Sequence, residues 1–168
     1  MKIKFNNSTI QQFNNRGFTL IELIVVFSVM AVLSVVGIAS FASYSRSQVL
    51  QQATTDLVNT LNTAKVRAAS QIKPSILQCN NGILESYKVV INDPSANKYT
   101  LYAVCSGSSV GAITTTLPLN VSFNSAVVKS ITYPVLTGGV NGSGDVVLSS
   151  YAQTKTVKIS LVGGISVQ

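Results

Sequence analysis

The sequence contains no histidine and no tryptophan, and only 10% of its 168 residues are charged. Without histidine, the Ser-His and Cys-His nucleophile systems and the usual zinc and copper sites are excluded. The five carboxylates are those of Glu22, Asp56, Glu85, Asp93 and Asp145, and the last two lie in turn-like Asp-Pro and Gly-Asp pairs. No glycine-rich stretch has the strand, lysine and helix of a phosphate-binding loop. The sequence therefore predicts no enzyme, no cofactor and no metal site.

Charge is scarce, and Ser, Thr and Asn supply much of the polar surface, as is more typical of an exported protein than of a cytosolic enzyme. The formal net charge of +7 includes Lys2, Lys4 and Arg16, so the rest of the chain has nine basic and five acidic residues, a net charge of +4. Those three basic residues precede an apolar segment. Because basic residues favour the cytoplasmic side of a membrane helix, we expect the C-terminal part to be exported.

Residues 23–41 are nineteen residues without a charge, interrupted only by Ser28, Ser34, Gly37 and Ser40. A helix over residues 18–41 would be roughly 35 Å long, against a hydrocarbon core of about 30 Å. It lacks the polar face that a core helix of a soluble domain would need. The segment therefore predicts a single membrane span.

A polar, basic leader of seventeen residues precedes this segment, and the residues from Gly17 to Glu22 read GFTLIE. A secretory signal has its apolar region before the cleavage site, whereas here the apolar region follows the glycine. This arrangement resembles the class III leader of type IV prepilins and type II secretion pseudopilins. The resemblance implies that a membrane-bound prepilin peptidase cleaves between Gly17 and Phe18 and methylates the new N-terminus at Phe18. The alternative is an uncleaved single-pass anchor.

Glu22 lies where a carboxylate costs roughly 2.5 to 3.5 kcal/mol to insert into a membrane. Thr19 and Glu22 have the spacing of a helix capping box, and the helix dipole favours an acid in the first turn. After cleavage, the free amine of Phe18 would lie one turn away. The resemblance to pilins implies a further role, compatible with the cap, in which Glu22 meets the N-terminal amine of a neighbouring subunit and sets the filament register.

After residue 45 the pattern changes to a narrow apolar stripe on an otherwise polar helix. The stripe recurs at spacings of three and four residues and consists of Leu50, Ala53, Leu57, Leu61, Ala64 and Ala68. Pro74 is expected to stop the helix, because the residue before a proline avoids the helical region. One helix over residues 19–72 would be roughly 80 Å long. Its second half needs a partner that covers the stripe.

From residue 75 onward the sequence alternates as β-strands do. Two alternating runs flank the turn-rich residues 92–97 and predict a hairpin. Their apolar positions are Tyr87, Val89, Ile91, Tyr99, Leu101 and Ala103. Residues 117–123 and 157–161 also alternate, and Gly163-Gly164 predicts a two-residue hairpin to a last strand. We expect about six to eight short antiparallel strands packed on the helix stripe, which is an α+β fold.

Four features of this region carry a second resemblance. They are the run Q-A-x3-L-x3-L-x2-A-x3-A from Gln52, a cysteine-bearing first strand at residues 77–79, a strand over residues 117–123, and a terminal strand pair around Gly163. Together they resemble the GspH/FimT-like minor pseudopilins. The resemblance implies a pilin-like ladle, in which a long N-terminal helix packs on an antiparallel sheet.

Two cysteines in an exported domain suggest a disulfide. Cys79 is expected to end the first strand and Cys105 the third, which would place them on neighbouring strands. Closing the 25 intervening residues would stabilise the fold by roughly 3 to 4 kcal/mol in the chain-entropy treatment. The alternative is two buried free thiols, because cysteine is a common core residue.

The sequence thus predicts four parts: a leader over residues 1–17, a transmembrane and filament-core helix over 18–45, an amphipathic helix over 46–73 and an exported β-rich domain over 74–168. We expect a minor pilin or pseudopilin of a type II secretion pseudopilus or type IV pilus. It would span the bacterial cytoplasmic (inner) membrane once, with its C-terminal domain periplasmic or extracellular, and join a filament after assembly. Its expected partners are prepilin peptidase, other pilins and the membrane.

The alternative function is that of a FimT-like pilin that binds DNA for natural transformation. The DNA-binding relatives carry C-terminal arginines, whereas residues 163–168 contain no basic residue. Stacking on tryptophan is excluded, and the tyrosines are as readily core or strand residues. They are Tyr87, Tyr99, Tyr102, Tyr133 and Tyr151. We therefore expect duplex DNA to bind weakly, with a Kd of roughly 10⁻⁴ M or weaker near physiological salt.

Overall fold

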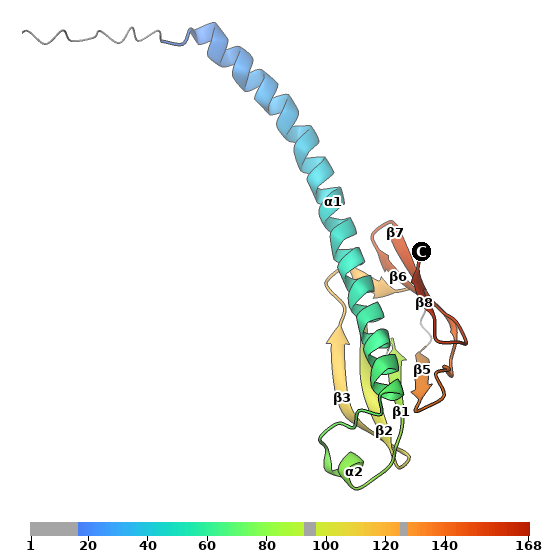
Figure 1. The fold of residues 1–168 in the computed structure, drawn as a ribbon. Helices are drawn as coiled ribbons and strands as arrows, with labels where there is room; N and C mark the ends of the chain where they lie inside the picture. The colour runs from blue at the N-terminus through green and yellow to red at the C-terminus, as the bar shows by residue number, and fades with distance from the viewer. Residues whose placement is uncertain (1–16, 93–96, 125–127) are drawn as a thin grey trace, which may run out of the picture. The chain divides into compact units, whose positions relative to one another are not determined.

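The longest element is α1 (Leu20–Ala69), a single helix of 50 residues, as the sequence predicts (Figure 1). The computed structural model describes residues 17–92, 97–124 and 128–168. The predicted leader, with Lys2, Lys4 and Arg16, lies outside these residues except for Gly17. The chain divides into two units, Met1–Phe41 and Ala42–Gln168, and the boundary falls within α1.

Helix α1 ends three residues before the predicted end at residue 72. Gln71 adopts a left-handed conformation with φ 51°. The N–H of Ile72 then reaches back to the carbonyl of Arg67 at 3.0 Å, which satisfies a carbonyl at the helix end. This local cap terminates α1, so Pro74 follows the end of the helix rather than causing it.

The strands form two antiparallel sheets of four strands each. The first has the order β3-β2-β1-β5, and the second has the order β4-β6-β7-β8. The first sheet contains β1 (Leu84–Ile91), β2 (Lys98–Cys105), β3 (Ser108–Thr116) and β5 (Lys129–Pro134). The second contains β4 (Val121–Phe123), β6 (Gly144–Ser150), β7 (Gln153–Ile159) and β8 (Ile165–Val167). The predicted α+β class and the antiparallel pairing are both confirmed.

One hydrophobic core joins the second half of α1 to both sheets. All six residues of the predicted stripe are buried, and Leu57, Leu61 and Ala64 have no exposed surface. Side chains from the two sheets meet them, among them Val89 and Val157. Figure 1 shows this part of α1 lying alongside β1 and β2. The narrow stripe is therefore the contact face of the helix.

The predicted hairpin over residues 87–103 is present, with β1 and β2 paired from Ile91↔Tyr99 to Leu84↔Cys105. Of its turn, Asn92 and Asn97 are described and have positive φ values of 57° and 31°. The predicted turn residues Asp93 and Pro94 lie outside the described part of the chain.

Three sequence predictions about strands were wrong. Residues 77–79 do not form a strand but belong to α2 (Leu77–Asn80), in which the N–H groups of Cys79 and Asn80 both bond the carbonyl of Ile76. Four residues are too few for periodicity to distinguish a helical turn from a strand.

The predicted strand over residues 117–123 is reduced to β4. A turn precedes it, because the N–H of Val121 bonds the carbonyl of Pro118 and Asn120 has φ 66°. The predicted two-residue hairpin at Gly163-Gly164 is a longer loop over residues 160–164. In it, the N–H of Gly163 bonds the carbonyl of Ser160, and Gly163 has φ 75°.

The predicted disulfide is present between Cys79 and Cys105, whose Cα atoms are 5.2 Å apart. It joins α2 to the end of β2, not two strands. Hydrogen bonds reinforce the link, since the N–H of Ser106 bonds the carbonyl of Ile83 at 3.0 Å and Lys73 Nζ bonds the carbonyl of Gly82 at 2.8 Å. The loop between α1 and β1 is thus fastened to the β2–β3 turn.

Candidate assembly segment and surface of the exported domain

Gly17 and Phe18 precede α1, separated from it by Thr19, and are both exposed. A Cβ atom added at Gly17 would meet nothing within 4 Å, and Phe18 is 78% exposed. The peptide bond between them is therefore accessible, as a cleavage site must be. Cleavage at this bond and methylation of Phe18 remain predictions.

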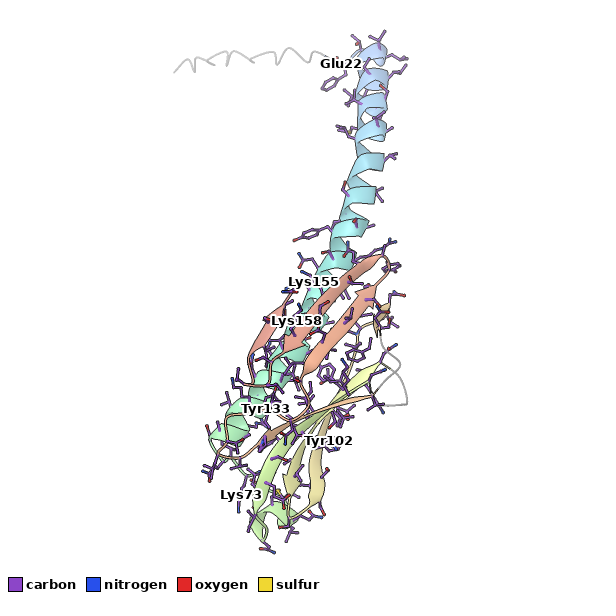
Figure 2. The ribbon with its side chains drawn as sticks, turned by 90° about the vertical axis from the view of Figure 1, so that its right-hand side faces the viewer. Glu22, Lys73, Tyr102, Tyr133, Lys155 and Lys158 are labelled. Carbon is purple, nitrogen blue, oxygen red and sulfur yellow. A yellow bond between two sulfur atoms is a disulfide. The ribbon has the colours of Figure 1, made fainter. Side chains whose placement is uncertain are left out.

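Glu22 lies in the first turn of α1 (Figure 2). Its backbone N–H donates to Thr19 Oγ1 at 3.3 Å, and the N–H of Leu23 donates to the carbonyl of Thr19 at 3.2 Å. Thr19 is therefore the N-cap of the helix, and its bond from the N–H of Glu22 is one of the two hydrogen bonds of a capping box. The Glu22 side chain is exposed. Its role toward a neighbouring subunit remains a prediction.

The first part of α1 is long and apolar enough to cross a membrane, and none of its most apolar 18-residue window is buried within the chain. Two of its hydroxyls bond within the helix: Ser28 Oγ donates to the carbonyl of Val25 at 2.8 Å, and Ser34 Oγ to that of Met30 at 2.7 Å. These bonds reduce the cost of placing serine in an apolar environment. No described residue outside α1 buries these apolar side chains.

Two lysines of the unit Ala42–Gln168 donate to backbone carbonyls, and two others lie on one strand. Lys65 Nζ bonds the carbonyl of Gly163 at 2.9 Å, and Lys129 Nζ bonds that of Asp145. Lys155 and Lys158 both lie on β7 (Figure 2). In the β6–β7 register, however, Lys155 pairs with the buried Leu148, whereas Lys158 pairs with the exposed Asp145. Paired residues share a face of the sheet, so these two lysines point to opposite faces.

Three of the five tyrosines that the sequence analysis singled out are buried strand residues: Tyr87, Tyr99 and Tyr133. Burial raises the pKa of all three, although the charge of Arg67 partly opposes this for Tyr87. The pKa of Tyr133 rises to about 12. Its hydroxyl is a buried side-chain polar atom for which the described residues offer no hydrogen-bond partner.

Of the remaining two, Tyr102 is half-buried in β2 and Tyr151 is exposed in the β6–β7 turn. The Arg46 guanidinium carbon lies 4.1 Å from the centroid of the Tyr151 ring. The sequence analysis did not predict this contact. Residues 149–154 read SSYAQT, and without glycine, proline or asparagine they give little sign of a turn.

Among the described residues, no group of three or more His, Cys, Asp or Glu side chains could hold a metal ion. The features of this chain that call for a function are therefore its exposed apolar helix and the residues around the start of that helix.

A family model described as the prokaryotic N-terminal methylation motif matches residues 12–38. Comparisons with curated proteins and with solved structures give no match. The matched residues include Gly17, Phe18 and Glu22 together with most of the apolar segment. Such a motif implies processing by prepilin peptidase and assembly with other pilins, and it points to a structural subunit rather than an enzyme. The chain thus carries the N-terminal motif of type IV pilin-like and pseudopilin subunits.

Proposed function

We propose that this protein is a minor pilin or pseudopilin of a type II secretion pseudopilus or type IV pilus. Prepilin peptidase removes residues 1–17 and methylates Phe18. Residues 18–45 anchor the chain in the bacterial inner membrane and later enter the filament core. The amphipathic part of α1 and the β-rich region remain outside as one folded domain.

The observation that carries this proposal is an apolar half-helix that no other described part of the chain covers, continuous with the helix of a folded domain. None of the residues in the 18-residue window is buried, although about 25 cal/mol is gained for each Å² of apolar surface removed from water. Lipid covers such a helix in the membrane, and the same helices of other subunits cover it in a filament. The matched methylation motif supports both of these environments, the membrane and the filament.

Glu22 sets the position of each subunit in this proposal. Removal of residues 1–17 creates a cationic amine at Phe18, and a neighbouring subunit presents its Glu22 carboxylate to it. In an apolar filament core, an unpaired carboxylate is costly, so only the register that pairs the two charges is favourable.

The DNA-binding alternative has less support from the surface of the exported domain. Non-specific DNA affinity depends on several cations that reach phosphates from one surface. Lys65 and Lys129 donate to backbone carbonyls, and Lys155 and Lys158 face opposite sides of β7. We therefore favour the structural role.

Co-expression with a prepilin peptidase tests the proposal. Mass spectrometry of the membrane fraction is expected to find a chain that begins at a methylated Phe18. Gly17→Leu should leave the precursor uncleaved, whereas Gly37→Leu, at the second glycine of the matched segment, should be processed normally. An unprocessed N-terminus at Met1 in the wild-type chain, with an active peptidase present, would refute the proposed function.

A further inference from the structure

Three separate segments meet where the exported domain begins. Arg46 comes from α1, Leu119 from the loop before β4, and Tyr151 from the β6–β7 turn, and all three line one recess of about 190 Å³. The β4–β6 register explains the meeting, because Val121 pairs with Ser150. Arg46 stacks on the Tyr151 ring at 4.1 Å. We call Arg46, Leu119 and Tyr151, together with Tyr44 two residues before Arg46 on α1, the helix-exit surface.

The apolar side chains of the helix-exit surface are unusually exposed. Leu119 is 90% exposed, Tyr44 62% and Tyr151 60%. Two turns present Leu119 and Tyr151 through non-glycine residues with positive φ, at 66° for Asn120 and 54° for Tyr151. For residues with a side chain this conformation is uncommon, and tyrosine is not among those that favour it. These two turns hold apolar groups toward the outside rather than into the core.

Tyr44 and Arg46 follow closely after the uncharged segment of α1. The uncharged segment ends at Phe41, and Tyr44 and Arg46 follow by three and five residues. At 1.5 Å per residue these positions lie about 4.5 and 7.5 Å farther along the helix axis. A polar zone of about 5 to 7 Å lies on each side of the hydrocarbon core. Tyrosine and arginine at this depth are typical of membrane interfaces.

The charge of this region has one sign among the described residues. Arg46 lies within the helix-exit surface. Lys155 is the third residue of β7, close to the turn that holds Tyr151. The nearest acid along α1 is Asp56, ten residues beyond Arg46. Asp145 begins β6 next to Gly144, at the opposite end of the strand from Tyr151. A basic, aromatic and apolar surface of this kind is complementary to anionic lipid headgroups.

We infer that the helix-exit surface docks on the anionic membrane surface in which the chain's own helix is anchored. Tyr44, Tyr151 and Leu119 enter the headgroup zone, and Arg46 binds lipid phosphates while it stacks on Tyr151. Docking holds the exported domain against the bilayer before assembly, and entry into a filament releases it. This inference rests on the membrane anchoring in the proposed function.

Single-tryptophan fluorescence tests the docking, because the chain contains no tryptophan. Tyr151→Trp places the probe on the surface and preserves an aromatic partner for Arg46. The full chain is reconstituted into vesicles of phosphatidylcholine and phosphatidylglycerol that contain brominated lipid, which quenches nearby tryptophan. Phe27→Trp reports on the anchored helix, and Tyr102→Trp in β2 serves as the control within the exported domain.

The expected result is quenching in the Tyr151→Trp and Phe27→Trp chains and none in the Tyr102→Trp chain. Adding Arg46→Gln to the Tyr151→Trp chain should lower the ratio of docked to undocked domain about fivefold, as expected from about 1 kcal/mol per basic residue near an anionic surface. Leu119→Ser should also reduce the quenching. In vesicles of phosphatidylcholine alone, the Tyr151→Trp chain should lose as much quenching as Arg46→Gln removes in anionic vesicles.

Three results would overturn the inference, and they differ in what else they contradict. Quenching of the Phe27→Trp chain without quenching of the Tyr151→Trp chain would mean that the helix is anchored but the domain does not dock. An unquenched Phe27→Trp chain would contradict the anchoring itself. Equal quenching in anionic and neutral vesicles, unaffected by Arg46→Gln, would contradict headgroup recognition.

Discussion

Helix α1 carries apolar side chains in both halves, but among the side chains that the structure describes only those of the second half are buried within the chain. Leu57 and Leu61 have no exposed surface, whereas Leu33 is 65% exposed and Val35 72%. The second half concentrates its apolar residues in one stripe, and two sheets cover it. The first half is apolar on every side, which no single sheet could cover. One half therefore stabilises the domain, and the other half depends on its surroundings.

The strongest test of this difference is a carboxylate placed in each half. Leu57→Asp should prevent the exported domain from folding, because it removes a buried apolar side chain and buries an unpaired charge. The expected loss exceeds about 5 kcal/mol, close to the whole stability of such a domain. Leu33→Asp should leave the domain folded and impair membrane insertion by roughly 2.5 to 3.5 kcal/mol.

Circular dichroism and limited proteolysis of both chains in detergent measure the first effect, and membrane fractionation measures the second. A domain that stays folded in the Leu57→Asp chain would show that the stripe is not the core of the fold.

The next largest effect is expected from replacing Glu22, one of the two acids of α1. Glu22→Ala should block co-purification with other pilins, because a buried amine of the neighbouring subunit loses its partner at a cost of about 3–5 kcal/mol. Asp56→Ala is the matched control and should assemble normally, since Asp56 lies on the exposed side of the second half. The measurement is a pull-down from membranes that contain the partner pilins.

Glu22→Ala leaves the hydrogen bond to Thr19 intact, because the backbone N–H of residue 22 makes it. Normal incorporation of the Glu22→Ala chain would therefore mean that this acid contributes only to the N-terminal end of the helix.

Removal of the disulfide should weaken only the exported domain. Cys79→Ser with Cys105→Ser opens a loop whose ends are 26 residues apart, which in the chain-entropy treatment costs about 3.5 kcal/mol. Urea denaturation measures the loss, and membrane association should not change. Non-reducing peptide mapping provides the check on the wild-type chain. Two free thiols in protein from the exported compartment would contradict the pairing.

The smallest expected effect concerns the buried hydroxyl of Tyr133. Tyr133→Phe should raise the free energy of unfolding by about 1 kcal/mol, because it removes a polar group that has no hydrogen-bond partner among the described residues. Tyr102→Phe, at a half-buried position, is the control and should change little. Equal stability of the Tyr133→Phe and wild-type chains would indicate that water or another group satisfies this hydroxyl.

The same residue predicts a pH dependence. The pKa of Tyr133 is about 12 in the folded chain, against 10.0 ordinarily, so the folded state holds this proton more tightly. The stabilisation is complete below about pH 10 and is lost as the pH rises toward 12, at no more than about 1.4 kcal/mol per pH unit. Urea denaturation at several alkaline pH values should show a shallower decline for the Tyr133→Phe chain.

Periodicity predicted the helix, its stripe and the alternating strands because those features repeat over many residues. All six residues of the stripe from Leu50 to Ala68 are buried, and the buried face adds only Thr54 among the polar residues of this helix. Single residues with unusual backbone conformations were not predictable in this way. Gln71 ends α1 and Asn120 shortens β4, and each does so through a positive φ that neither residue type requires.

The candidate site residues also differ in whether a local sequence pattern could predict them. Gly17, Phe18 and Glu22 belong to one contiguous motif, so the sequence alone could identify them. The stacking of Arg46 on Tyr151 joins residues 105 positions apart, and no local pattern marks either residue. The disulfide lies between these cases, because composition suggested the pairing of Cys79 and Cys105 while the element that carries Cys79 was predicted wrongly.

The contact between Lys65 and the carbonyl of Gly163 joins positions 98 residues apart and has a consequence for the order of folding. If the chain enters the membrane with its N-terminal helix first, the stripe on α1 reaches the exterior well before Val157 and Ile159, which help to cover it. Contacts so distant in sequence form slowly. If the proposed export takes place in this order, the stripe stays uncovered until the later strands arrive, and the domain completes its fold only after they have crossed the membrane.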